Sequence, residues 1–281
     1  MKNRAAARLS RTARFRRFTC GKAQDRTTFT KRSSATAAGP KIIVSMDSFD
    51  RIASAAQQDP QQTPRFNDRH EAGRILARQL AGYAGKHNTI VLGLPRGGVP
   101  VAYEIADALR LPLDIFVVKK ISLPGYGEMA LGAVASEGVY ILDEELIEHL
   151  GLSQSEVEQI ATTAYEEVER RESRYRDNRP PPRIEKQTVI VVDDGLATGS
   201  SMQVAVNALR RKHPARIVVA VPVASQEAAV EVKAVADELV CARIPDPFYA
   251  VGLWYDDFSQ TSDEEVRELL NSAAARQRQA S

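Results

Sequence analysis

Residues 189–202 read VIVVDDGLATGSSM, and this stretch decides the fold. Its four β-branched residues, 189–192, predict a buried strand that ends at the adjacent acids Asp193 and Asp194. Small and hydroxyl residues then lead into a helix expected from about Ser200, where backbone N–H groups and the helix dipole favour an anion. Carboxylates are poor ligands for an anion, so the two acids are expected to face hydroxyl groups or a cation. The stretch therefore predicts a phosphate-binding loop beside a paired-acid strand end.

Outside this stretch, short apolar runs alternate with amphipathic segments. Strands are expected over 89–94, 113–118, 188–192, 216–223 and 238–242, and helices over 68–81, 99–110, 153–176, 200–212, 226–236 and 261–275. A hairpin is expected within 129–142. This alternation predicts an α/β fold in which helices cover both faces of a parallel twisted sheet. Ligands on such sheets bind at the carboxyl ends of the strands, where the loops 95–98, 119–127 and 193–201 would meet.

The composition fits one α/β domain of ordinary size with extra material, or at most two domains. The chain has 281 residues, of which 43% are hydrophobic and 26% charged. Its longest apolar runs, such as 217–224, are strand-length and far below the roughly 20 residues that a bilayer requires. Cys20 and Cys241 form neither a disulfide framework nor a zinc site, and the four histidines show no metal-ligand spacing. These features predict a cytoplasmic protein without a membrane partner.

Charge is unevenly distributed along the chain. Residues 1–40 carry eleven Lys and Arg against one acid, a balance of +10, so the net charge of +2 leaves −8 for the remainder. The basic segment suits a transit peptide for organellar import, a nucleic-acid-binding or plain disordered tail, or sequence upstream of a translation start at Met46. Residues 54–65 are a polar linker in composition. We therefore expect residues 1–64 to be a disordered basic arm and linker, and residues 65–281 to form the folded domain.

Residues 189–202 resemble the binding motif for 5-phosphoribosyl-1-pyrophosphate (PRPP) in the type I phosphoribosyltransferases, whose fold is Rossmann-like with a small hood and a flexible loop. The resemblance implies that Asp193 and Asp194 hold the ribose 2′- and 3′-hydroxyls, act in catalysis, and hold Mg²⁺ mostly through substrate and water. It further implies that the 5′-phosphate is bound by the loop residues Ala197, Thr198, Gly199, Ser200 and Ser201. A generic strand end with acids, as in receiver domains, lacks the glycine and hydroxyl loop directly after the acid pair.

Two further loops fit the same family. The loop 95–98 takes the place of its pyrophosphate loop, and the resemblance implies that pyrophosphate is bound by Arg96, Gly97 and Gly98. The segment 119–127 resembles the mobile catalytic loop of adenine phosphoribosyltransferases, in which basic residues precede Leu-Pro-Gly, so Lys119 and Lys120 are candidate catalytic residues. Such a loop would keep water from a reactive intermediate. Without the family, the first loop is an ordinary turn and the second a solvated loop.

The C-terminal segment 244–256 resembles the base-binding segment of hypoxanthine-guanine phosphoribosyltransferases. There an aromatic ring stacks on the purine, and an acid lies four residues after a glycine. By that resemblance Phe248 or Tyr249 stacks on the base and Asp256 contacts it; aromatic packing at the edge of the domain is the alternative. Those enzymes carry a lysine after the fourth strand, whereas residues 223–226 here read VASQ. The acceptor therefore stays open among nucleobases and other nitrogen compounds.

The resemblance implies a reaction in which a ring nitrogen displaces pyrophosphate from C1 of PRPP, with Mg²⁺ as the cofactor. The expected partners are PRPP and a small-molecule acceptor, and nucleic acid is not expected. A homodimer is one oligomeric state that the sequence allows. A non-catalytic PRPP-sensing regulator with the same fold is the alternative. A P-loop nucleotide-binding protein is disfavoured because the chain has no Gly-x-x-x-x-Gly-Lys-Ser/Thr sequence.

Overall fold

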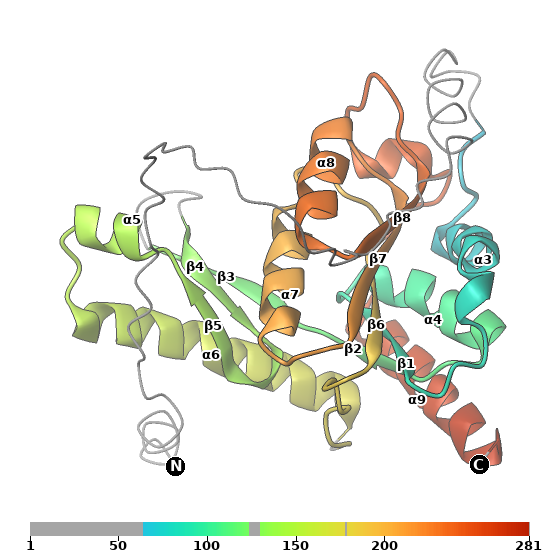
Figure 1. Ribbon diagram of the computed structural model, residues 1–281, viewed down its shortest axis with the longest axis horizontal. Helices are drawn as coiled ribbons and strands as arrows, with labels where there is room; N and C mark the ends of the chain where they lie inside the picture. The colour runs from blue at the N-terminus through green and yellow to red at the C-terminus, as the bar shows by residue number, and fades with distance from the viewer. Residues whose placement is uncertain (1–63, 124–129, 178, 281) are drawn as a thin grey trace, which may run out of the picture. The chain divides into compact units, whose positions relative to one another are not determined.

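The computed structural model describes residues 64–123, 130–177 and 179–280, and the structural statements below concern these ranges (Figure 1). Nearly all of the predicted basic arm lies outside them, as do residues 124–129 of the predicted basic loop. Among the described helices, none has the length and apolar character needed to cross a membrane.

The centre of the fold is a five-stranded parallel sheet with the strand order β2-β1-β6-β7-β8. Its strands are β1 (Thr89–Gly93), β2 (Leu113–Ile115), β6 (Thr188–Val192), β7 (Arg216–Val223) and β8 (Glu238–Arg243). Gly93 pairs with Val192, and Val192 with Ala220, so β1, β6 and β7 are in register near their carboxyl ends. The segments that follow β1 and β6 therefore leave the sheet side by side, as predicted.

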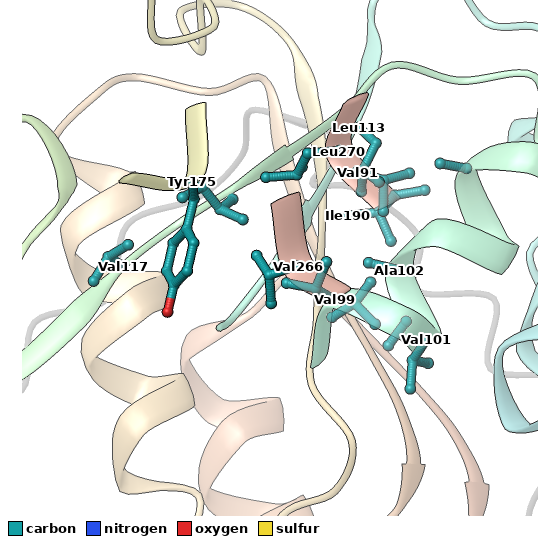
Figure 2. Close-up of a cluster of buried hydrophobic side chains, with 14 of the residues drawn as sticks. Val91, Val99, Val101, Ala102, Leu113, Val117, Tyr175, Ile190, Val266 and Leu270 are labelled. Atoms are coloured by element: carbon teal, nitrogen blue, oxygen red, sulfur yellow. The ribbon is translucent and has the colours of Figure 1, made fainter. Parts of the chain in front are cut away.

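Helices cover both faces of this sheet (Figure 1). The helices on one face are α3 (Arg69–Gln79), α4 (Gly98–Leu109) and α9 (Asp263–Ala280), and those on the other are α7 (Ser200–Arg210) and α8 (Gln226–Val235). Successive strand residues point to opposite faces, so Val91 packs into the first layer and Leu92 into the second. Figure 2 shows part of the first layer, where the sheet meets α4 and α9 through Val91, Val99, Ile190, Val266 and Leu270.

Side chains cap the helices where the sequence predicts starts. The Asp68 carboxylate accepts the Glu71 N–H at 2.7 Å at the start of α3. At the C-terminal helix, the Ser262 hydroxyl accepts the Glu265 N–H at 3.0 Å. That helix, α9, runs to Ala280, beyond its predicted end.

A second sheet is antiparallel, with the order β3-β4-β5. Its elements are β3 (Val118–Ser122), β4 (Ala130–Ala135), the 3₁₀ turn η2 (Ser136–Gly138) and β5 (Val139–Leu142). The last three make the predicted hairpin. The helix α6 (Gln154–Arg176) packs on this sheet and begins with the predicted capping box of Ser153 and Glu156. Shorter elements are α5 (Glu144–His149), η1 (Ala81–Tyr83) and η3 (Val251–Trp254).

Two predictions in this region are wrong. The strand predicted over 113–118 is divided, because β2 ends at Ile115 and β3 begins at Val118. The basic loop was expected to begin at Lys119, but Lys119 and Lys120 both lie within β3 and pair with β4. The pairing partner is a distant part of the chain, so local sequence did not reveal that the strand continues through the two lysines. The short helix α5 was also not predicted.

Candidate functional site

The loop after β6 is open, and backbone contacts hold its base. The Leu196 N–H donates to the Val223 carbonyl at 2.9 Å. The Ser225 hydroxyl donates to the Ala197 carbonyl at 2.8 Å. Ala197 and Thr198 are themselves exposed. The loop is therefore anchored to β7 and the start of α8 while its tip remains accessible to a ligand.

Hydroxyl groups gather where this loop enters α7. Gly199 has a φ of 68°, a left-handed conformation that glycine adopts without strain. The Thr198 and Ser200 hydroxyl oxygens lie 3.0 Å apart on either side of it, and Ser201 is exposed. The free N–H groups and dipole of a helix start favour negative charge. The predicted 5′-phosphate residues thus form one accessible, anion-favouring loop.

The acid pair lies half-buried at the end of β6. Asp193 accepts the Asp194 N–H through Oδ1 at 2.9 Å. Asp194 Oδ2 accepts a hydrogen bond from Nε of Arg69 at 2.9 Å and lies 2.8 Å from Nη2 of the same guanidinium. Burial and the Asp194 carboxylate raise the pKa of Asp193 well above its usual value. Burial also raises the pKa of Asp194, and the Arg69 guanidinium opposes that rise.

The glycines of the loop 95–98 lie directly against the acid pair. A β-carbon built on Gly98 would lie 2.6 Å from the Val192 carbonyl oxygen and 2.8 Å from Cα of Asp193. A β-carbon built on Gly97 would overlap the Asp194 carboxylate. The peptide bond between Pro95 and Arg96 is cis, and α4 begins at Gly98. Two loops from separate parts of the chain therefore make one continuous surface at the carboxyl edge of the sheet.

Arg96 is half-buried and faces the start of α9. Its Nη1 lies 3.8 Å from Oδ1 of Asp263. Asp263 also accepts hydrogen bonds from Nη1 of Arg174 at 2.6 Å and from the Tyr175 hydroxyl at 2.7 Å. The Arg96 guanidinium is thus only loosely engaged by the protein, and it flanks the glycines of the predicted pyrophosphate loop.

Lys119 and Lys120 are not brought into this group of residues. Lys119 Nζ bonds to the Glu167 carboxylate of α6, which also accepts a hydrogen bond from Arg171 at 2.6 Å. Along α6, Glu167 lies about 10 Å before Arg174, the residue that shares Asp263 with Arg96. Lys120 lies on the opposite face of β3 and is exposed. The catalytic role predicted for the two lysines stays a prediction, and only Lys120 is exposed.

A pocket of about 630 Å³ connects the predicted phosphate loop with the C-terminal aromatic segment. It is lined by Ala197, Thr198, Ser200, Ser225, Glu227, Glu231, Phe248 and Tyr249. Phe248 is half-buried and Tyr249 is 76% exposed. Asp256 is exposed, its N–H donates to the Phe66 carbonyl at 2.8 Å, and its side chain does not line the pocket. Both candidate stacking residues thus face the predicted phosphate site, whereas Asp256 does not.

Ser225 occupies the region where purine-specific relatives would carry a lysine. Its hydroxyl accepts the Ala228 N–H at 3.0 Å as the cap of α8, while it donates to Ala197. The hydroxyl is therefore engaged within the protein, and it replaces neither the charge nor the reach of a lysine.

Sequence reasoning missed Arg69 and Tyr255, which contact Asp194, and Phe258, which packs against both of them. The Arg69 contact spans 125 residues of sequence, and the Tyr255 hydroxyl donates to the Asp194 carbonyl at 2.6 Å. An arginine directly after a helix cap carries no local signal for such a role. Only the aromatic cluster of the C-terminal segment hinted at contacts here.

Within the described ranges, no group of three or more His, Cys, Asp or Glu side chains is arranged to hold a metal ion. Asp193 and Asp194 supply oxygen ligands, the kind that Mg²⁺ prefers, and Mg²⁺ usually keeps several waters and substrate oxygens in its coordination shell. The acid pair therefore fits a magnesium ion that is held largely by the substrate.

The five-stranded parallel sheet flanked by helices, with the acid pair at the end of β6, matches the type I phosphoribosyltransferase fold. A family model described as "Phosphoribosyl transferase domain" matches residues 66–256, and the chain belongs to that family. A crystal structure of the protein TT1426 from Thermus thermophilus is 43% identical in sequence, with a TM-score of 0.66, and the match covers 74% of this chain and 98% of that one.

Two curated relatives come from Mycobacterium tuberculosis. "Putative phosphoribosyl transferase Rv0571c" of strain H37Rv is 39% identical over 208 residues, which are 74% of this chain and 47% of the relative. The protein MT0597 of strain CDC 1551 matches to the same extent. The chain thus spans about half the length of the curated relatives it matches.

Proposed function

We propose that this protein transfers the 5-phosphoribosyl group of PRPP to a nitrogen acceptor, a nucleobase or related compound, and releases pyrophosphate. The observation that carries the proposal is the contact of Gly97 and Gly98 with Asp193 and Asp194. PRPP combines a pyrophosphate, a ribose diol and a 5′-phosphate in one molecule. The loop 95–98, the acid pair and the hydroxyl loop offer matching groups in that order along one edge of the sheet.

Each element has a defined part in the proposed reaction. The carboxylates accept hydrogen bonds from the ribose hydroxyls and hold C1 toward the acceptor. The hydroxyl loop fixes the 5′-phosphate, and the Arg96 guanidinium offsets negative charge on the departing pyrophosphate. Bound Mg²⁺ would supply further neutralisation of the leaving group, with Asp193 and Asp194 holding it through substrate and water. Positioning and charge stabilisation then provide most of the rate, without a protein nucleophile.

The pocket beside the phosphate loop is the proposed acceptor site. Phe248 and Tyr249 supply aromatic faces for stacking, and Ser225 provides no cation for a purine carbonyl oxygen. These features favour an acceptor other than a 6-oxopurine. We further propose that the protein acts in the cytoplasm and that PRPP and the acceptor are its small-molecule partners. A homodimer is the assembly that we propose to test.

A PRPP-sensing regulator without catalysis is the second candidate. The bond between Lys119 and Glu167 favours it, because a lysine held in a strand is less available to a reaction than one on a loop. The deciding experiment measures Mg²⁺-dependent pyrophosphate release from PRPP with a panel of nucleobases and other nitrogen acceptors. Release with one acceptor supports the enzyme. Tight PRPP binding without release for any acceptor supports the regulator.

A further inference from the structure

Arg69 is the side chain most closely bound to the acid pair. Its side chain is 10% exposed, and it contacts Asp194 through both Nε and Nη2 at 2.9 and 2.8 Å. Both contacts fall on a single carboxylate oxygen, Oδ2. The other oxygen, Oδ1, is not engaged by Arg69. The guanidinium therefore fixes the carboxylate and leaves one of its oxygens for another donor.

The guanidinium is itself held rigidly by the C-terminal segment. Its Nη1 donates to the Ser259 carbonyl at 2.7 Å, and its carbon lies 3.9 Å from the centroid of the Phe258 ring. The Tyr255 ring packs 5.0 Å from Phe258, and the Tyr255 hydroxyl donates to the Asp194 carbonyl at 2.6 Å. Arg69 thus binds the side chain of Asp194 and Tyr255 binds its backbone, and both neighbours pack against Phe258.

This arrangement extends to the loop proposed to hold pyrophosphate. A β-carbon on Gly97 would lie 3.3 Å from Nε of Arg69, as well as against the Asp194 carboxylate. The helix α3 is also attached to the fold by its apolar side chains, since Ala72 and Leu76 are fully buried. Anchoring the helix therefore does not require the guanidinium to reach the acid pair.

We propose, resting on the proposed function, that Arg69 is a positioning residue that orients the Asp194 carboxylate toward the ribose hydroxyls of PRPP. Removing it should weaken ligands that carry the ribose and spare those that carry only pyrophosphate. A carboxylate without this partner is free to turn, and the hydroxyl it accepts loses a fixed acceptor.

The test uses the full chain and four proteins: wild type, Arg69→Gln, Arg69→Lys and the control Arg74→Gln. Arg74 lies on the same helix and is 51% exposed, with its Nη1 3.5 Å from Glu104, away from the acid pair. Calorimetry gives the Kd of ribose 5-phosphate and of Mg-pyrophosphate, and turnover gives KM and kcat for PRPP. Thermal unfolding reports whether each variant is folded.

For Arg69→Gln we expect the Kd of ribose 5-phosphate and the KM for PRPP to rise roughly 10- to 100-fold, by analogy with residues that orient metal-ligating side chains. We expect Mg-pyrophosphate binding to be unchanged and kcat to fall, because a carboxylate that is not held in place no longer fixes C1 toward the acceptor. Arg69→Lys should recover part of the affinity because it keeps the charge near Asp194, and Arg74→Gln should behave as wild type.

Equal weakening of ribose 5-phosphate and Mg-pyrophosphate would overturn the positioning role, as would wild-type affinity in Arg69→Gln. If Arg69→Gln does not fold, Arg69→Lys is judged by the same selective loss, and an equal loss for both ligands rejects the role. A wild-type protein that binds neither PRPP nor ribose 5-phosphate would instead reject the proposed function itself.

Discussion

Gly97 and Asp194 are packed so closely that a β-carbon added to Gly97 would overlap Oδ2 of the Asp194 carboxylate. Non-bonded carbon and oxygen atoms do not overlap in this way, so any β-carbon at position 97 would force the carboxylate or the loop to shift. The backbone of the loop after β1 is thereby placed beside the carboxylates after β6. Ligand binding at this edge of the sheet should depend on the contact.

Gly97→Ala should weaken PRPP binding at least about ten-fold, equivalent to ~1.4 kcal/mol. The added methyl group forces either the Asp194 carboxylate or the loop 95–98 out of place. Calorimetric titration with PRPP and Mg²⁺ measures the change. Gly82→Ala is the matched control, because a β-carbon there meets nothing within 4 Å. Equal affinities for the two variants would contradict the close contact.

The double variant Asp193→Asn, Asp194→Asn should lose measurable PRPP binding and keep its fold. Asparagine has nearly the size of aspartate but lacks the charge, and each side chain offers one acceptor oxygen in place of two. Calorimetry measures the binding, and circular dichroism checks the fold. Asp107→Asn serves as the control, since Asp107 is 52% exposed and pairs with Arg276. Unchanged affinity for PRPP in the double variant would show that Asp193 and Asp194 are not part of the PRPP site.

The two lysines of β3 should differ in their effects. Lys120→Met is expected to lower kcat/KM for PRPP about ten-fold, or ~1.4 kcal/mol, because its exposed ammonium is free to meet a charged substrate. Lys119→Met is expected to cost about 0.5 kcal/mol of stability with little kinetic change, since its ion pair with Glu167 is partly exposed. Steady-state kinetics and urea unfolding separate the two effects. The opposite pattern would show that the Lys119 pair opens during the reaction.

Tyr249→Ala should raise the KM of the acceptor and leave the KM of PRPP unchanged. Stacking on an aromatic ring contributes roughly 1–3 kcal/mol per base, and Tyr249 is free to supply it because its side chain is largely exposed. Phe248 packs against the cluster around Phe66 and Trp254, so Phe248→Ala should mainly lower the thermal midpoint. Steady-state kinetics with the best acceptor compare the two variants. An unchanged acceptor KM in both would show that Phe248 and Tyr249 serve packing and not acceptor binding.

Arg176 joins α6 to the central sheet, and Arg176→Met should destabilise the fold by about 3–5 kcal/mol. The side chain is 7% exposed and donates to Asp114 at 2.9 Å, to Glu172 at 2.6 Å and to the Ile115 carbonyl at 3.0 Å. Its loss leaves two buried carboxylates without their partner. Urea unfolding measures the cost, with Arg183→Met as a control at a 73% exposed site. Equal urea midpoints for Arg176→Met and Arg183→Met would show that Arg176 does not stabilise the contact between α6 and the sheet.

Local sequence predicted the elements whose pattern is contained within a few residues. The β-branched run before Asp193 predicted β6, and the small and hydroxyl residues after it predicted an open loop leading into α7. The Pro-Arg-Gly-Gly turn was expected beside that loop because parallel strands bring their carboxyl ends to one edge. Caps at Asp68 and Ser153 marked helix starts correctly.

Tertiary structure alone decided the features that depend on distant partners. Arg69 acquires its relation to Asp194 only when α3, β6 and the C-terminal segment come together. Lys119 lies in a strand because β4 pairs with it, and it contacts Glu167 because α6 packs on that sheet. Hydrophobic periodicity and capping act between near neighbours in the chain, whereas ion pairs and strand pairing are selected by the packing of whole elements. The sequence by itself therefore determined where the hydroxyl-rich loop and the acid pair lie, and the folded arrangement decided which side chains hold them in position.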